Sequence, residues 1–242
     1  MVAHLRAGYT ILELAIVITI VALIITMTIT VGIARIEMQR ANTTDTRMTY
    51  LIKALKAYVD VYGHLPCPAD GALATTDTNY GWGAGTGTGT CSASNLQDSG
   101  TVVAGAIPVI NLGIDPLVSV DGWGNKITYV VTEALTNPKT FSGNGAITIL
   151  NGYSGGGPVT YTTKAAYAIL SHGSNGHGAW RAKGGLGAGS NERYDAGIAD
   201  ATDEGENAHL ETPASYDKEY VQKFFVSDFD DVLLYKTMSQ LQ

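Results

Sequence analysis

The sequence predicts an α+β fold, in which one long N-terminal helix, membrane-spanning in its first half, packs on a small antiparallel β-sheet domain with long glycine-rich loops. Two observations lead to this expectation. An apolar run, 14–34, is followed by apolar residues at helical spacing as far as Tyr62. After Leu65, short β-branched segments alternate with stretches rich in glycine.

The composition indicates an ordered protein and argues against nucleic acid as its main partner. Hydrophobic residues make up 45% of the 242 residues and charged residues 15%, which is unlike a disordered chain. The formal net charge is −7, and the basic residues are dispersed rather than gathered into a run that would follow a phosphate backbone.

The apolar run is long enough to cross a bilayer as a helix. Between Leu14 and Ala34 the only residues that are not apolar are four threonines and one glycine. With residues 9–12 included, the run is long enough to span the hydrocarbon of a bilayer as a helix. Glu13 is the exception, and a carboxylate in the bilayer centre costs at least ~2.5–3.5 kcal/mol. A secretory signal peptide cut near Ala34 and a plain anchor remain alternatives, but neither of them needs Glu13.

An amphipathic helix is predicted to continue the apolar run over 35–63. Gly63 and Pro66 end it, and a continuous helix from Tyr9 would be about 80 Å long. Residues 39–46 have weak helix propensity, so the helix could bend or melt there. The residues expected to pack on the domain share one face: Met48, Leu51, Ile52, Leu55, Tyr58, Val59 and Tyr62.

The remaining residues, 64–242, are expected to form the β domain. Period-two alternation and β-branched residues predict a strand at 126–131, and 146–150, 165–170 and 232–235 are further strand candidates. Cys67 and Cys91 lie in the same compartment and favour a disulfide that closes a ring of about 25 residues, worth roughly 3–4 kcal/mol. Two buried free thiols are the alternative.

The N-terminal stretch "RAGYTILELAIVITIVALI" resembles the start of type IV pilins and type II secretion pseudopilins. Gly8, Tyr9 and Glu13 match the family's glycine, aromatic residue and acid at the start of its apolar helix. The resemblance implies a leader peptide at 1–8, cleavage by a prepilin peptidase between Gly8 and Tyr9, and methylation of the Tyr9 amine. It also implies a filament-core helix over 9–34, in which Glu13 pairs with the Tyr9 amine of a neighbouring subunit.

The resemblance continues in "LPCPADG", "DGWGN", "SHGSNGHGAW" and "FDDV", which are similar to segments of pilin-like proteins. It implies a structural subunit of a type IV pilus or a pseudopilus, and not an enzyme. The implied partners are further copies, other pilin-like subunits, the prepilin peptidase and an inner-membrane assembly platform. The subunit would be held in the bacterial inner membrane with a periplasmic domain before it enters a filament. Thr30 stands where many pilins have proline, which favours a pseudopilin or a minor pilin.

A calcium loop is the first candidate site, because the major pseudopilin that the chain resembles binds calcium in the equivalent loop. Residues 192–231 contain twelve Asp or Glu against three Lys or Arg, and calcium prefers oxygen ligands on glycine-rich turns. The candidate ligands are Asn175, Asp195, Glu206 and Asn207, although the pseudopilin's short Asp-rich run is not reproduced. A solvated acidic loop is the alternative, and no cofactor is required.

Other catalytic or binding motifs are weak. His172, His177 and His209 lack the spacing of a zinc protease, and their glycine-rich flanks favour a turn. "GAGTGTGT" lacks the Lys-Ser/Thr ending of a phosphate loop, and no GxSxG nucleophile motif occurs. A membrane-anchored or secreted periplasmic binding domain or enzyme, unrelated to filaments, remains the alternative function.

Overall fold

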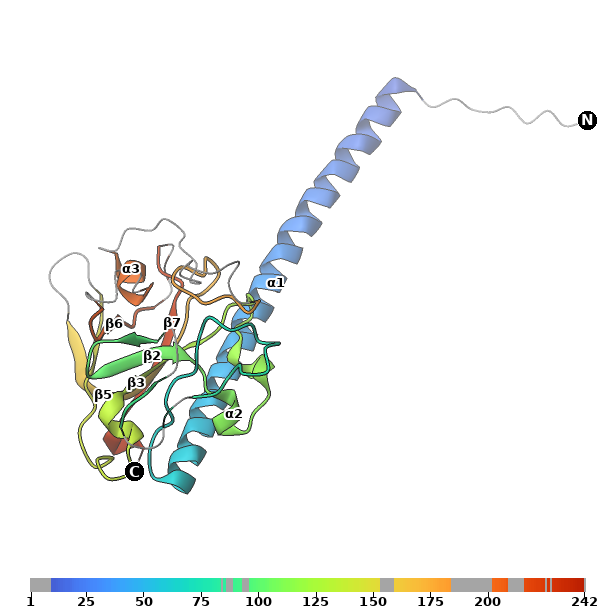
Figure 1. Ribbon diagram of the computed structural model, residues 1–242. Coiled ribbons are helices and arrows are strands. Elements are labelled where there is room, and N and C mark those ends of the chain that lie inside the picture. The colour runs from blue at the N-terminus through green and yellow to red at the C-terminus, as the bar shows by residue number, and fades with distance from the viewer. Residues whose placement is uncertain are drawn as a thin grey trace, which may run out of the picture. The chain divides into compact units, whose positions relative to one another are not determined.

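A computed structural model describes residues 10–83, 85, 89–92, 96–152, 159–183, 202–208, 216–224, 226 and 228–241. They form two compact units, one ending at Asn42 and the other running from Thr43 to Gln242. The helix α1 (Ile11–Tyr62) contributes to both, and the expected α+β fold is confirmed (Figure 1). The other elements are β1 (Gln97–Asp98), β2 (Val102–Ala106), α2 (Val109–Leu112), η1 (Pro116–Ser119), β3 (Thr128–Thr132), η2 (Glu133–Thr136), β4 (Ile147–Leu150), β5 (Thr160–Ser171), α3 (Asp203–Ala208), β6 (Glu219–Val221), β7 (Val232–Thr237) and η3 (Met238–Gln240).

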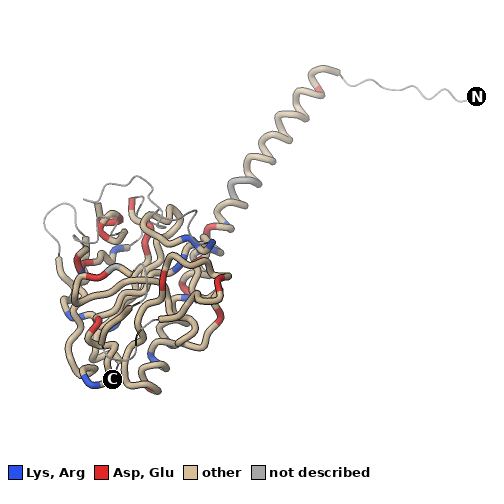
Figure 2. The backbone as a smooth tube through the Cα atoms, in the orientation of Figure 1, with Lys and Arg blue, Asp and Glu red and all other residues tan. Residues whose placement is uncertain are grey.

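The first unit contains the N-terminal part of α1, which is apolar on all sides between Leu14 and Ala34 apart from four threonines and one glycine. The only charged residue between Ile11 and Ala34 is Glu13, and Figure 2 shows the charged residues concentrated beyond this part of the helix. The side chains described from Ile11 to Met27 are exposed. By length and composition α1 could span a membrane. Helix formation continues without interruption through 39–46, so the helix is not melted there.

The C-terminal part of α1 packs on one face of the sheet in the second unit. Met48, Leu51, Leu55 and Val59 are buried there, as their spacing predicts. Polar contacts add to this packing, since Arg47 donates to the carbonyl of Val120 at 2.6 Å. This half of the helix is therefore part of the domain's core.

Over the described residues the sheet has seven strands in the order β1-β2-β3-β5-β4-β6, with β7 paired to β5. The four expected strands correspond to β3, β4, β5 and β7, and Figure 1 shows β2, β3 and β5 side by side. The expectation of a purely antiparallel sheet is wrong, because β4 and β6 run parallel. Between β4 and β6 the chain forms β5, which is antiparallel to β4, and then a long connection that contains α3. The strand β6 then runs in the same direction as β4.

Both faces of the central strands are buried, and all five residues of β3 are buried, including its two terminal threonines. Tyr129 and Val131 belong to the core that contains α1, whereas Val130 belongs to a second core on the opposite face. The same alternation separates Tyr167 and Ile169 of β5 from Ala168. The second core also contains Tyr216, which precedes β6 by a few residues, and Tyr220 of β6.

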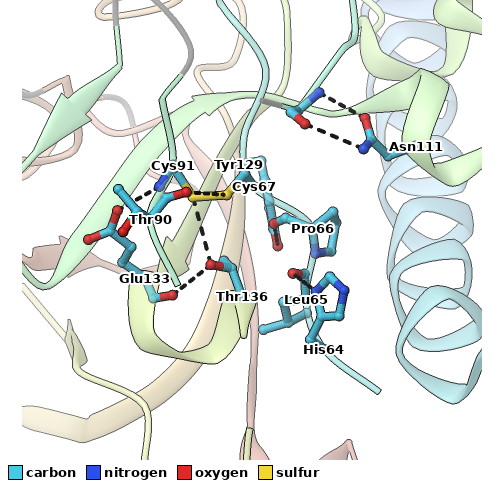
Figure 3. The surroundings of a disulfide bond; sticks show 11 residues. His64, Leu65, Pro66, Cys67, Thr90, Cys91, Asn111, Tyr129, Glu133 and Thr136 are labelled. Atoms are coloured by element: carbon cyan, nitrogen blue, oxygen red, sulfur yellow. Dashed lines mark hydrogen bonds between the residues drawn. A yellow bond between two sulfur atoms is a disulfide. The ribbon is translucent and has the colours of Figure 1, made fainter. Parts of the chain in front are cut away.

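The disulfide expected from the sequence is present between Cys67 and Cys91, with Cα atoms 5.5 Å apart. Figure 3 shows that Glu133 and Thr136, from η2, lie beside it. The amide of Cys91 donates to Glu133 Oε1 at 2.8 Å. This hydrogen bond attaches the ring closed by the disulfide to the end of β3.

Candidate functional site

Glu13 lies in the first turn of α1 and forms a capping box with Thr10. The amide of Glu13 donates to Thr10 Oγ1 at 3.2 Å, and the amide of Thr10 donates to Glu13 Oε2 at 3.4 Å. Two amides that lack helical partners are thus satisfied within one turn. The Thr-x-x-Glu pattern before an apolar run is a sequence signature of this motif, which the search for an assembly residue overlooked. Gly8 and Tyr9 lie outside the described residues.

An acidic triad, defined as Glu204, Asp230 and Asp231, forms the strongest candidate site in the described part of the chain, with Glu204 and Asp231 buried and Asp230 half-buried. Each of the three can place a carboxylate oxygen within 4.8 Å of the others. Glu204 comes from α3, and the two aspartates directly precede β7. Asp231 and Glu204 are 5% and 4% exposed, so water cannot screen their mutual repulsion well.

Several donors hold the triad from neighbouring loops. Ser174 donates its amide and its hydroxyl to Asp230 Oδ2, both at 2.7 Å, and the amide of Asn175 reaches the same oxygen at 3.0 Å. Asn175 Nδ2 donates to Glu204 Oε2 at 2.8 Å. The amide of Asp230 donates to Glu204 Oε1 at 2.9 Å. The turn after β5 is therefore tied to both α3 and the start of β7.

Gly173 allows this close approach. Its φ of +57° lies in the left-handed region, and a Cβ there would meet Cγ of Asp230 at 2.4 Å. A side chain at this position would push the turn away from the triad. Glycine is therefore required both by the backbone conformation and by the lack of space.

Asn207 fixes the third carboxylate. Its Nδ2 donates to Asp231 Oδ2 at 2.9 Å and to the carbonyl of Val221 at 3.0 Å, while its Oδ1 accepts from the amide of Val221 at 2.7 Å. Glu204 and Asn207 are three residues apart in α3, so they project from the same side of the helix. This spacing brings α3 and β6 to the same acidic triad.

The remaining oxygens of the triad fit a cation. Asp230 Oδ1 and Asp231 Oδ1 are buried and accept no hydrogen bond within the described structure. Burial raises the pKa of Asp231 well above its ordinary value, although the bond from Asn207 opposes this, and the charges of Glu204 and Asp230 raise it further. The pKa of Glu204 is also raised, chiefly by burial. Three hard carboxylate donors suit calcium or magnesium better than zinc or copper.

The expected ligands are only partly brought together. Asn175 and Asn207 lie at the triad, where their amide groups donate to its carboxylates. Glu206 lies instead in a second acidic group with Asp217 and Glu219, because it projects from a different side of α3. Asp195 lies outside the described residues. The sequence analysis missed Glu204, Asp230 and Asp231, although "FDDV" places two adjacent acids before a strand.

The histidine cluster is not supported as a metal site. His172 and His177 are buried, His172 Nε2 lies 3.0 Å from Thr128 Oγ1, and His209 lies outside the described residues. The acidic groups that the described structure brings together contain no histidine. The two buried histidines instead belong to the turn that follows β5, as the glycine-rich flanks indicate.

The comparisons with known proteins add no relative to this description. No family model matches the chain, and neither a curated protein nor a solved structure matches it.

Proposed function

We propose that this chain is a structural subunit of a type IV pilus or a type II secretion-like pseudopilus. A prepilin peptidase would cut it between Gly8 and Tyr9, and an inner-membrane assembly platform would pack it with copies of itself and other pilin-like subunits. Its C-terminal domain would lie in the periplasm before the subunit enters a filament. In this proposal the chain catalyses no reaction.

The observation that carries the proposal is the division of one continuous helix into two kinds of surface. Residues 11–27 are apolar and exposed on all sides, whereas Met48, Leu51 and Leu55 of the same helix are fully buried in the domain. A helix that is apolar all round needs lipid or the apolar helices of other subunits around it. A subunit that moves from a membrane to a filament core would supply both environments in turn.

Glu13 is the residue on which assembly would depend. It is the only charged residue in the apolar part of the helix, and an unpaired carboxylate in that environment is costly. Capping accounts for part of its role, since its Oε2 accepts from the Thr10 amide. Capping does not require a negative charge, however, because glutamine serves at this position of a capping box. The charge itself would therefore serve to pair with the Tyr9 amine of an adjacent subunit.

Two substitutions separate the charge from the cap. Glu13→Gln removes the charge and retains the capping geometry, whereas Thr10→Val removes the hydroxyl that caps the helix and retains the charge. We expect Glu13→Gln to abolish recovery of the subunit in filaments sheared from the cell surface or isolated from the periplasm, and Thr10→Val to leave most of it. The domain should be folded in both variants, because Glu13 lies outside the unit that begins at Thr43.

Equal incorporation of Glu13→Gln and the unchanged chain would contradict the charge-pairing proposal. If, in addition, the unchanged chain never enters a filament, the alternative of a membrane-anchored or secreted periplasmic binding domain or enzyme would be favoured.

We further propose that the acidic triad holds a divalent cation, with calcium as the first choice. Glu204, Asp230 and Asp231 would supply carboxylate oxygens, and Asn175 and Asn207 would keep two of these carboxylates in place. The cation would neutralise charges that burial otherwise penalises. Its role would be structural, since it would join the turn after β5, α3 and the start of β7.

A further inference from the structure

Lys126 is a fully buried lysine, and its ammonium group needs partners inside the domain. The residue lies just before β3, and its amide donates to the carbonyl of Trp180 at 2.8 Å. Its Nζ donates to the carbonyl of Gly71 at 2.6 Å and also to the carbonyl of Leu73. The same atom lies 5.2 Å from the centroid of the Tyr80 ring, whose face attracts a cation.

These three groups belong to one stretch of chain, residues 68–83, which we call the cover segment. The stretch lies inside the ring that the Cys67–Cys91 disulfide closes, and Figure 3 shows how that bond is held against η2. Cys67 directly precedes the cover segment in the chain. The groups that solvate the buried ammonium are therefore tethered by the disulfide.

Non-covalent contacts place the cover segment over the sheet. Ala69 exchanges two backbone hydrogen bonds with Ala106 of β2, at 2.8 and 2.9 Å. The amide of Thr75 donates to the carbonyl of Ala182 at 2.9 Å. Gly71 lies so close to the indole of Trp180 that a Cβ would meet it at 2.4 Å. Tyr80 is anchored by a 2.6 Å hydrogen bond between its hydroxyl and Ser119 Oγ.

We propose that the Cys67–Cys91 disulfide is a redox-sensitive lock on the cover segment, and that its reduction uncovers Lys126 while the rest of the domain stays folded. A dithiol reductant attacks one sulfur, the S–S bond breaks, and two protons and two electrons pass to Cys67 and Cys91 as the dithiol becomes a cyclic disulfide. The ring constraint is then lost from the open state, which shifts local opening by about two orders of magnitude. This inference concerns the domain alone and does not depend on filament assembly.

Because the disulfide holds the cover segment closed, the final packing of this domain would depend on whether its compartment is reducing or oxidising. Thiols stay reduced in a cytosol, so the cover segment would remain loosely held there. In an oxidising compartment a protein or small-molecule disulfide accepts the two electrons, and closure of the ring would complete the solvation of the Lys126 ammonium. Domain maturation would thereby follow the redox state of the surroundings.

Lysine acylation measures this opening directly. The full chain in detergent micelles is treated with the N-hydroxysuccinimide ester of acetic acid, with and without dithiothreitol, and each lysine is quantified by peptide mass spectrometry. We expect the rate at Lys126 to rise at least about tenfold on reduction. Lys139 and Lys164, which are exposed, should change by less than about twofold and serve as internal controls. The double variant Cys67→Ala with Cys91→Ala should reproduce the reduced rate without any reductant.

Two results would overturn the proposal. One is an unchanged rate at Lys126 when thiol alkylation shows that both cysteines are reduced. The other is loss of the domain's cooperative thermal transition on reduction, because the disulfide would then support the whole fold rather than the cover segment. If the double variant does not fold, the comparison of the unchanged chain before and after reduction still tests the proposal.

Discussion

The Nδ2 atom of Asn207 lies 2.9 Å from Asp231 Oδ2, so an amide at the end of α3 holds one carboxylate of the acidic triad. The same Nδ2 donates to the carbonyl of Val221, which links the triad to β6. Asn175 makes the corresponding contact with Glu204 from the turn after β5. A cation bound here would therefore strengthen contacts among three segments that are distant in sequence.

Calcium is predicted to stabilise the domain after treatment with EDTA. At a concentration a hundredfold above its dissociation constant it should add about 2.7 kcal/mol, which corresponds to a rise of roughly 5–10 °C in Tm for a domain of this size. Differential scanning fluorimetry at neutral pH measures the shift. Asp231→Asn should remove most of it, because Asp231 Oδ1 is a buried oxygen available to the ion.

A matched control comes from the second acidic group. Asp217→Asn removes an exposed carboxylate near Glu206 and Glu219 and should leave the calcium-dependent rise in Tm unchanged. The cation proposal fails if both variants respond to calcium like the unchanged chain, or if the unchanged chain does not respond.

Gly173→Ala is predicted to be more destabilising than an alanine at another left-handed glycine. Gly113, at the end of α2, has a φ of +65° but no atom within 4 Å of a Cβ built there. Gly113→Ala should therefore cost only the backbone term of about 1–2 kcal/mol. Gly173→Ala should cost at least about 1 kcal/mol more, since its Cβ would collide with Asp230. Urea unfolding of the two variants gives the comparison, and equal losses would show that the turn can move away from Asp230.

Alkaline pH is predicted to unfold the domain through its buried tyrosines. Burial raises the pKa of Tyr80 from 10.0 to about 12, partly offset by its bond to Ser119, and raises the pKa of Tyr129 and Tyr167 as well. Between pH 10 and 12 the unfolded state loses the Tyr80 proton first, so the free energy of unfolding falls as pH rises. Tyr80 alone accounts for roughly 3 kcal/mol of this loss.

Absorbance at 295 nm and circular dichroism, followed together against pH, check this behaviour. The buried tyrosines should ionise only as the circular dichroism signal is lost. Ionisation of Tyr80, Tyr129 and Tyr167 near pH 10 in a protein that stays folded would contradict their burial.

Much of the fold follows from local patterns in the sequence. The spacing of Met48, Leu51 and Leu55 identifies the face of α1 that packs on the sheet, and this face is buried as predicted. The strands β3 and β5 were also predicted, β3 from its alternation and β-branched residues, whereas β2 was missed. The parallel pairing of β6 could not be predicted, since a three-residue strand has no period of its own and its partner β4 is distant in sequence.

The site was harder to predict than the fold. Whether Glu204 or Glu206 faces the aspartates depends on the rotation of a six-residue helix, which the acidic composition of the region does not reveal. Lys126 was placed in a predicted strand, but nothing in its alternation indicates that its ammonium is enclosed by residues some fifty positions earlier. By contrast, the capping partner of Glu13 could have been read from Thr10, three residues before it.

The most direct test of the filament proposal is the mass of the N-terminal peptide of the protein recovered from membrane and sheared-surface fractions. The account predicts a mature chain that begins at N-methylated Tyr9. An uncut chain beginning at Met1, or an N-terminus near residue 34, would contradict prepilin processing, and the domain would then have to be understood as an independent periplasmic module.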